Sequence, residues 1–202
     1  LGLFLIVLLV AASVAAGEKP PVAKAPVSDQ DEIVRQLERT QSLFLKSIEG
    51  LSEAQWTFKP ATERWSIAEC AEHIAASEPF IREMIAKAVA NELTPEMLTA
   101  GTRHDEKLLK GLIDRSQKFK APEPLIPTNR FGTPEAAIEA FKKERGETIK
   151  LAKNAGDLRT HGDKHFLFGP LDAYGWFLFT SGHSERHTLQ IEEVKADAGF
   201  PK

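Results

Sequence analysis

Apolar residues recur at helical spacing along most of this chain. The segment SDQDEIVRQLERTQSLFLKSIEGL begins with Ser28, a good N-cap residue, followed by acidic residues suited to a first helical turn. Its main apolar positions share one helical face: Ile33, Leu37, Phe44, Leu45, Ile48 and Leu51. The pattern predicts a first long amphipathic helix.

A second long helix is predicted for SIAECAEHIAASEPFIREMIAKAVA. Ser66 is its N-cap candidate, and Glu69 follows three residues later, which is the spacing of a capping box. The apolar stripe includes Ile67, Ile74, Ile81 and Ile85 at helical spacing. Pro79 lies inside the pattern, and we expect it to kink the helix.

Two further long helices are predicted nearer the C-terminus. TPEAAIEAFKKERGETIKLAKNA has Thr133 as N-cap and Pro134 at the first helical position. The last helix lies in GPLDAYGWFLFTSGHSERHTLQIEEVKADAGFP, where we expect it to be opened by Pro170 and closed near Gly199. A shorter amphipathic helix is expected around residues 103–119, before the third long one.

The chain carries no alternating strand pattern and no Asn-Gly hairpin signal. The predicted fold class is therefore all-α. Four long amphipathic helices bury their apolar faces best as a four-helix bundle, here with a short extra helix before the third long helix.

Composition narrows the class of function. The 202 residues fit one domain, and the formal net charge of −3, without a block of basic residues, gives no electrostatic case for a nucleic-acid partner. The single cysteine, Cys70, excludes an internal disulfide and a multi-cysteine zinc site. We expect Cys70 to be a buried, inert thiol.

Residues 1–16, LGLFLIVLLVAASVAA, form an apolar run that ends in small residues. The run is shorter than the roughly 20 residues that span a bilayer, and its end resembles a small-x-small cleavage site. We predict a signal peptide over 1–16, a disordered Pro-rich linker over 17–28 and the bundle domain over 29–202. The protein would then be exported, to a periplasmic or extracellular location. An uncleaved anchor, which would attach it to a membrane, and a buried helix stay open as alternatives.

The candidate chemistry lies in SGHSERHTLQIEE, where His183 and His187 stand four residues apart. This spacing puts two imidazoles on one helix face, one turn apart, where both can reach a single ion. The motif alone is weak, because such pairs arise by chance. His73, near the apolar stripe of the second helix, adds a third imidazole on a face that should point inward.

Burying imidazoles without partners is costly, and a shared metal ion explains all three histidines at once. Three histidine ligands leave a tetrahedral ion one open position for water or substrate, as in catalytic zinc sites. Structural histidines in a plain bundle are the alternative. The sequence identifies no catalytic residue beyond these metal-ligand candidates.

Three neighbouring residues are candidates for supporting roles. Glu69 lies one turn before His73 and is either a group that orients its imidazole or a capping-box carboxylate. Arg186 could hold an anionic substrate group or pair with another helix. Gln190, one turn past His187, could hydrogen-bond near the ion or only complete the packing.

The remaining candidates have simpler interpretations. Arg145 in the third long helix is expected to make an interhelical ion pair. His104, His161 and His165 fall in predicted loops or helix ends, so we expect them at the surface, although His161 and His165 could rim the site.

Three stretches of the chain resemble the DinB-like superfamily: LSEAQWTFKPATERWSIAECAEHI, KAPEPLIPTNRFGTPEAAIEAFKKER and LFGPLDAYGWFLFTSGHSERHTLQIEEVKADAGFP. The similarity covers most of residues 29–202. It implies a four-helix bundle of up-down-down-up topology. It also implies a divalent metal ion, zinc or nickel, held by three histidines that map to His73, His183 and His187.

The resemblance leaves the activity open. Some relatives are thiol-dependent transferases or isomerases that use bacillithiol, mycothiol or glutathione, and many have no known activity. Low-molecular-weight thiols are expected to be scarce outside the cytoplasm, so the predicted export weakens the transferase interpretation and leaves hydrolase-like chemistry open. The expected activity is that of a metal-dependent transferase or hydrolase acting on a small-molecule substrate. A non-catalytic metal-binding or stress-response module is the alternative. A homodimer is an expectation from related bundles.

Overall fold

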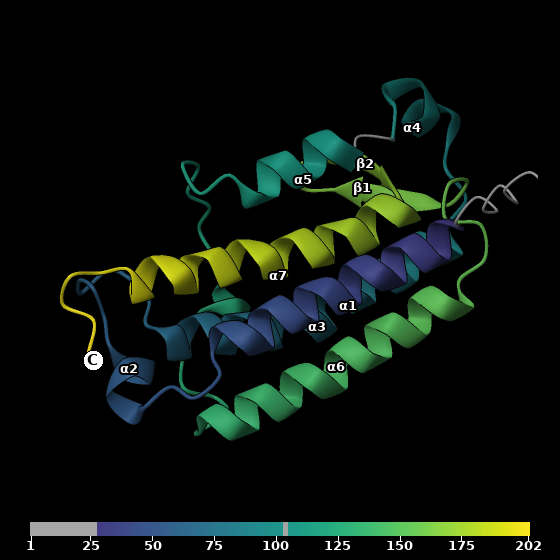
Figure 1. Ribbon diagram of the computed structural model, residues 1–202. Helices are drawn as coiled ribbons and strands as arrows, with labels where there is room; N and C mark the ends of the chain where they lie inside the picture. Colours follow the sequence, from purple (N-terminus) through teal and green to yellow (C-terminus); the bar gives the residue numbers. More distant parts are fainter. Residues whose placement is uncertain (1–27, 103–104) are drawn as a thin grey trace, which may run out of the picture.

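Four long helices form the body of the protein in the computed structural model, which describes residues 28–102 and 105–202. Their bounds are α1 (Asp29–Ser47), α3 (Ile67–Ala90), α6 (Pro134–Asn154) and α7 (Ala173–Lys195). Figure 1 shows α1 and α7 running in one direction along the bundle and α3 and α6 in the other. This is the predicted up-down-down-up bundle, and the fold class is confirmed.

Helix α7 lies between α1 and α3, and α6 packs against the same two helices from the other side. Helices α3 and α6 can run parallel because the chain returns along the bundle between them. The return segment holds α4 (Pro95–Ala100), α5 (Asp105–Ile113), which packs on α7, and the 3-10 turn η1 (Glu123–Leu125). Helix α5 is the predicted extra helix, but it ends at Ile113 rather than near 119.

The predicted helix starts rest on the expected caps. The hydroxyls of Ser28, Ser66 and Thr133 accept hydrogen bonds from backbone N–H groups in the first turns of α1, α3 and α6. Ser66 and Glu69 form a complete capping box. Helix α3 continues through Pro79 to Ala90. A second capping box, at Ser52, begins the short helix α2 (Glu53–Thr57).

A β-hairpin that the sequence pattern did not predict lies before the last helix. Strands β1 (Gly162–His165) and β2 (Gly169–Asp172) pair antiparallel directly before α7. Pro170 lies in β2, so the prediction that it opens the last helix is wrong. The N-cap is Asp172, whose carboxylate accepts from the Gly175 N–H at 2.7 Å, and the helix ends at Lys195.

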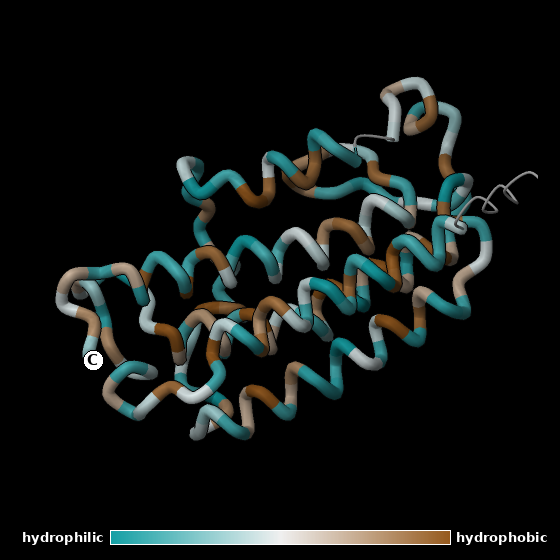
Figure 2. Tube along the Cα trace, viewed as in Figure 1, coloured by the Kyte–Doolittle hydropathy of each residue, from teal (hydrophilic) through white to brown (hydrophobic). Residues whose placement is uncertain are grey.

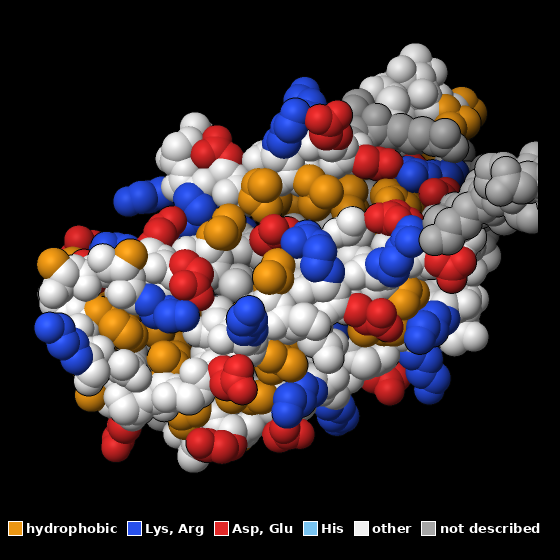
Figure 3. All heavy atoms as spheres, in the orientation of Figure 1, with side chains coloured by type: hydrophobic (Ala, Val, Ile, Leu, Met, Phe, Trp, Pro, Cys, Tyr) orange, Lys and Arg blue, Asp and Glu red, His pale blue; other side chains and the backbone are white. Residues whose placement is uncertain are grey.

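The bundle interior is apolar, because the buried residues of the four long helices form two hydrophobic clusters. Figure 2 shows hydrophobic positions, in brown, recurring between hydrophilic ones along these helices. On the face drawn in Figure 3, basic and acidic side chains are interspersed over α1 and α6, and no histidine shows. The polar outer faces and apolar inner faces are those that the helical spacing predicted.

One buried polar network ties the four long helices together. The guanidinium of Arg145 on α6, fully buried, binds both carboxylate oxygens of Glu78 on α3, at 3.0 and 2.5 Å. It also donates to the Leu37 carbonyl and the Thr40 hydroxyl on α1, and to the Ser184 hydroxyl on α7. The predicted interhelical ion pair of Arg145 is confirmed. Its partners fix the relative positions of α3 and α7 beside the histidines.

The predicted signal peptide and the linker up to residue 27 lie outside the described residues, as does His104. Of the predicted linker, only Ser28 is described, as the N-cap of α1. Among the described helices, none combines the length and the apolar character needed to cross a membrane.

Candidate metal centre

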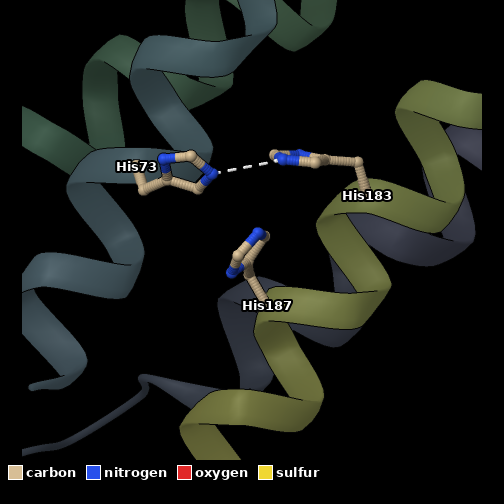
Figure 4. Close-up of side chains that lie close together, drawn as sticks. All are labelled: His73, His183 and His187. Carbon is tan, nitrogen blue, oxygen red and sulfur yellow. Dashed lines mark hydrogen bonds between the residues drawn. The ribbon is translucent and has the colours of Figure 1, made fainter. Parts of the chain in front are cut away.

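The three predicted histidines meet in the bundle. His73 projects from α3, and His183 and His187 project from consecutive turns of α7 toward it (Figure 4). One nitrogen of each ring lies within 4.8 Å of the corresponding nitrogens of the other two. The contact joins residues that lie far apart in the sequence. The amphipathic pattern of α3 and α7 nevertheless predicted it, because that pattern placed the histidines on inward faces.

The spacing of these nitrogens fits one ion. Nitrogens bound to one zinc ion at its usual bond length, with a tetrahedral angle between them, are about 3.3 Å apart. The Nε2 atoms of His73 and His183 are 3.2 Å apart. His187 faces the same point, with its ring centre 4.5 Å from that of His73 and 4.7 Å from that of His183.

Hydrogen bonds on the far side of two rings set their tautomers. Nδ1 of His73 lies 2.8 Å from the carbonyl oxygen of Leu125, and Nδ1 of His187 lies 3.0 Å from Oε1 of Gln190. Both oxygens only accept, so each Nδ1 carries the proton and each Nε2 keeps a lone pair. This is the arrangement of a metal-binding histidine with an outer partner.

The site also keeps the imidazoles neutral. Burial is the largest cause that lowers the pKa of His73, and it lowers the pKa values of His183 and His187 well below 6.5. The positive charges of Arg186 and Arg145 add to the effect on the pKa of His183. Neutral imidazole rings can offer nitrogen lone pairs to a cation.

Of the residues expected to support the histidines, Gln190 contacts one of them and Glu69 does not. Gln190 orients His187, which was one of its two proposed roles. Glu69 does not contact His73. Its carboxylate binds the Ser66 N–H at 2.7 Å and Lys59 at 2.9 Å, so the capping-box interpretation holds. The partner of His73 is instead the Leu125 carbonyl, which a side-chain motif cannot reveal.

Within the described part of the chain, Arg186 forms no ion pair, and backbone carbonyls bind it instead. Its guanidinium donates to the carbonyls of Leu112 at 2.8 Å and Asp114 at 2.7 Å, and to that of Gln117. These carbonyls belong to the end of α5 and the segment after it. Arg186 therefore holds α5 and the following loop against α7.

A buried carboxylate that the sequence analysis missed anchors the loop over His73. Glu72 accepts from the N–H groups of Thr128 and Asn129, each at 2.7 Å, and from Nε of Arg130 at 2.9 Å. Burial opposes its charge, but these hydrogen bonds outweigh it and lower the pKa of Glu72. The anchored loop follows η1, whose last residue, Leu125, supplies the partner of His73.

A cavity of about 670 Å³ opens beside the three histidines. Its walls come from the segment before α3, from α3, α5 and α7, from the loop after α5 and from the hairpin turn. They include Trp65, Phe80, Met84, Phe168 and Phe179. Trp65 packs against the site itself, with its ring tilted against that of His73 at 4.9 Å between ring centres. The volume lies within the usual range for small-molecule sites.

His165 is buried, so the expectation that it lies at the surface is wrong. Its Nδ1 accepts hydrogen bonds from the N–H groups of Leu167 and Phe168, at 3.1 and 3.3 Å. It packs against the rings of Trp176 and Phe179. His165 thus shapes the hairpin turn that borders the cavity, and it is not one of the residues lining the cavity.

Comparisons with known proteins agree with this architecture. The chain is 26% identical over 151 residues to the uncharacterized protein YuaE of Bacillus subtilis (strain 168), which covers 73% of this chain and 88% of YuaE. The solved structure of YfiT from Bacillus subtilis, described as a probable metal-dependent hydrolase with an unusual four-helix bundle topology, matches with a TM-score of 0.54. At 15% identity, and covering 92% of this chain and 97% of YfiT, that match establishes the fold alone.

The sequence profile of the DinB superfamily matches residues 36–191, which include α3, α7 and all three histidines. That span is well over half of the chain. The chain therefore belongs to the DinB superfamily.

Proposed function

We propose that this protein is a metal-dependent hydrolase whose divalent ion is held by His73, His183 and His187. One observation carries the proposal. Three neutral imidazoles, of which those of His73 and His187 are buried and that of His183 is half-buried, have ring nitrogens within 4.8 Å of one another at the wall of a cavity of about 670 Å³. A packing role for the histidines explains neither their convergence nor the acceptors behind two of the rings.

The donor set favours a transition-metal ion such as zinc or nickel. Imidazole nitrogens suit zinc, copper, iron and nickel, whereas magnesium and calcium prefer oxygen ligands. The described residues offer only these three ligands in the cluster, which leaves a position for water or substrate. When bound there, such an ion supplies Lewis acidity that activates water or polarises a carbonyl group.

The residues of the chain hold and isolate the site. Leu125 and Gln190 keep the lone pairs of His73 and His187 turned inward through Nδ1. Trp65 and Phe179 flank the histidine rings and exclude bulk water from that side. A dry surrounding strengthens electrostatic interactions with a polarised substrate.

Two considerations favour hydrolysis over thiol transfer. The fold neighbour YfiT is described as a probable metal-dependent hydrolase. The export proposed from residues 1–16 would also remove the protein from cytoplasmic thiols. The cavity argues against a non-catalytic module, because an ion that serves only stability needs no space for a substrate.

The test is hydrolysis of p-nitrophenyl esters and anilides by the full chain, loaded separately with zinc and with nickel. We expect turnover that disappears after chelation and returns on reloading. His187→Ala should abolish turnover, whereas His161→Ala, a histidine outside the cluster, should not. Absence of turnover in both metal-loaded forms across the panel, together with thiol-transfer activity, would replace hydrolysis by the transferase alternative.

A further inference from the structure

The side chains that line the cavity indicate the chemical class of ligand that it could bind. Its inner part is apolar, with Phe80, Ile81 and Met84 of α3 facing Phe168 and Phe179. Four large apolar side chains that line it are also exposed: Phe119 (48%), Ile126 (40%), Phe166 (66%) and Leu167 (52%). Leaving four such groups in water at one opening is unfavourable unless a ligand covers them.

The charge at this opening is opposite in sign to that of the whole chain. The formal net charge is −3, yet the cavity is lined by five cationic side chains and only two acidic ones. Arg115 is neutralised by Glu193, and Arg186 binds backbone carbonyls. Lys118 and Lys120 are exposed and form no ion pair within the described part of the chain.

An unsatisfied hydroxyl marks the inner end. Ser77 lines the cavity one helical turn after His73 and is 1% exposed. Its Oγ has no hydrogen-bond partner among the described residues, whereas Ser184 and Thr188 bond back to carbonyls one turn earlier. A buried hydroxyl without a partner is costly, so a polar ligand atom in this part of the cavity would be favoured.

We infer that the cavity takes an amphipathic, anionic substrate. Its polar reacting group lies near Ser77 and the histidines, an apolar chain or aryl group fills the middle, and its anionic group meets Lys118 and Lys120 at the opening. The inference rests on the proposed function for the reacting bond. The recognition of an apolar chain with a charged end does not depend on it.

Binding is tested on the chelator-treated full chain by calorimetry, with octanoate, decanoate, dodecanoate and the uncharged dodecan-1-ol as probes. We expect affinity to rise about four-fold for each added methylene, the usual gain from burying one such group. Dodecanoate should bind more tightly than dodecan-1-ol, and the difference should shrink as salt rises.

Matched variants locate the two parts of the site. Lys118→Ala/Lys120→Ala should remove the preference for dodecanoate over dodecan-1-ol. Lys87→Ala/Lys153→Ala, which removes two exposed charges outside the cavity lining, should leave it intact. Met84→Glu should weaken both probes at least ten-fold, and Leu98→Glu, at an exposed position away from the cavity, should weaken neither.

Affinity that is independent of chain length, or unchanged in Met84→Glu, would overturn the inference. Co-sedimentation of the protein with phosphatidylglycerol vesicles, without binding of the monomeric probes, would also overturn it. That result would assign the apolar opening to contact with a membrane surface. The two proposals fail separately. Length-dependent binding without hydrolysis leaves the binding site standing, and hydrolysis of acetate esters without length dependence leaves only the proposed function.

Discussion

At the scale of single residues, the outer partners of the histidines carry the most specific chemistry. The spacing of His183 and His187, and the place of His73 on an inward face, were sufficient to predict that the three rings meet. The Leu125 carbonyl behind His73 could not be predicted, because any residue type supplies a backbone carbonyl. Its position depends on how the loop after η1 is anchored by Glu72.

The bond between Gln190 and His187 gives a direct prediction. In Gln190→Ala, Nδ1 of His187 loses its acceptor, so the ring is free to rotate and to change tautomer. Loss of such an outer partner costs roughly 10- to 100-fold in metal affinity. Competition with a chromophoric chelator measures this, and Glu192→Ala, an exposed change on the same helix, should leave the affinity unchanged.

His165 predicts a pH dependence of stability. Burial lowers its pKa from 6.5 to about 4, so between these values the unfolded chain binds a proton that the folded chain does not. Stability should therefore fall as pH falls from about 6.5 toward 4. Urea unfolding at pH 7 and pH 5 measures the loss.

The His165→Phe variant isolates this contribution. Phenylalanine fits an aromatic surrounding but cannot accept from Leu167 and Phe168, so the variant should be less stable than the wild type at pH 7. The gap between the two proteins should narrow at pH 5. A gap of equal size at both values would contradict the assigned protonation.

At the scale of elements, long helices were predictable and short elements were not. The caps at Ser66 and Thr133 and the apolar stripes act locally, so the sequence pattern reveals them. The hairpin has strands of four residues each and a turn at Gly169, which has a φ of 74°. Strands this short carry no readable alternation, and their pairing depends on packing against α7 and α3.

The C-terminal end of α5 is held by the side chain of Arg186 rather than by a glycine cap. Arg186 satisfies carbonyls at its end, so Arg186→Met should expose them and cost about 1.5–3 kcal/mol, the usual contribution of hydrogen bonds from a charged group. Hydrogen exchange should accelerate over 105–113. Arg39→Met, which breaks the partly exposed pair with Glu185, should cost at most about 1 kcal/mol.

At the scale of the whole molecule, the Arg145–Glu78 pair holds the four helices in the arrangement that joins the histidines. Arg145→Met leaves Glu78 buried without its partner, and breaking such a pair costs about 3–5 kcal/mol. The double variant Glu78→Met/Arg145→Met should recover much of that loss. Denaturant unfolding of the two single variants and the double variant measures the coupling.

The ion pair between Arg82 and Glu144 serves as the control. Like the Arg145–Glu78 pair it joins α3 to α6, but its side chains are 25% and 20% exposed. Arg82→Met should cost far less than Arg145→Met. Equal costs for the two variants would show that burial is not what makes the central pair important.

The most direct test of the account is the metal content of the full chain, purified without a polyhistidine tag and measured by elemental analysis. We expect close to one equivalent of zinc or nickel in the wild type and in His161→Ala. We expect loss of the metal in His73→Ala, His183→Ala and His187→Ala, each still folded by circular dichroism. A wild-type chain that holds no zinc or nickel even after reloading would contradict the assignment of a metal centre, and would leave the three histidines as packing residues.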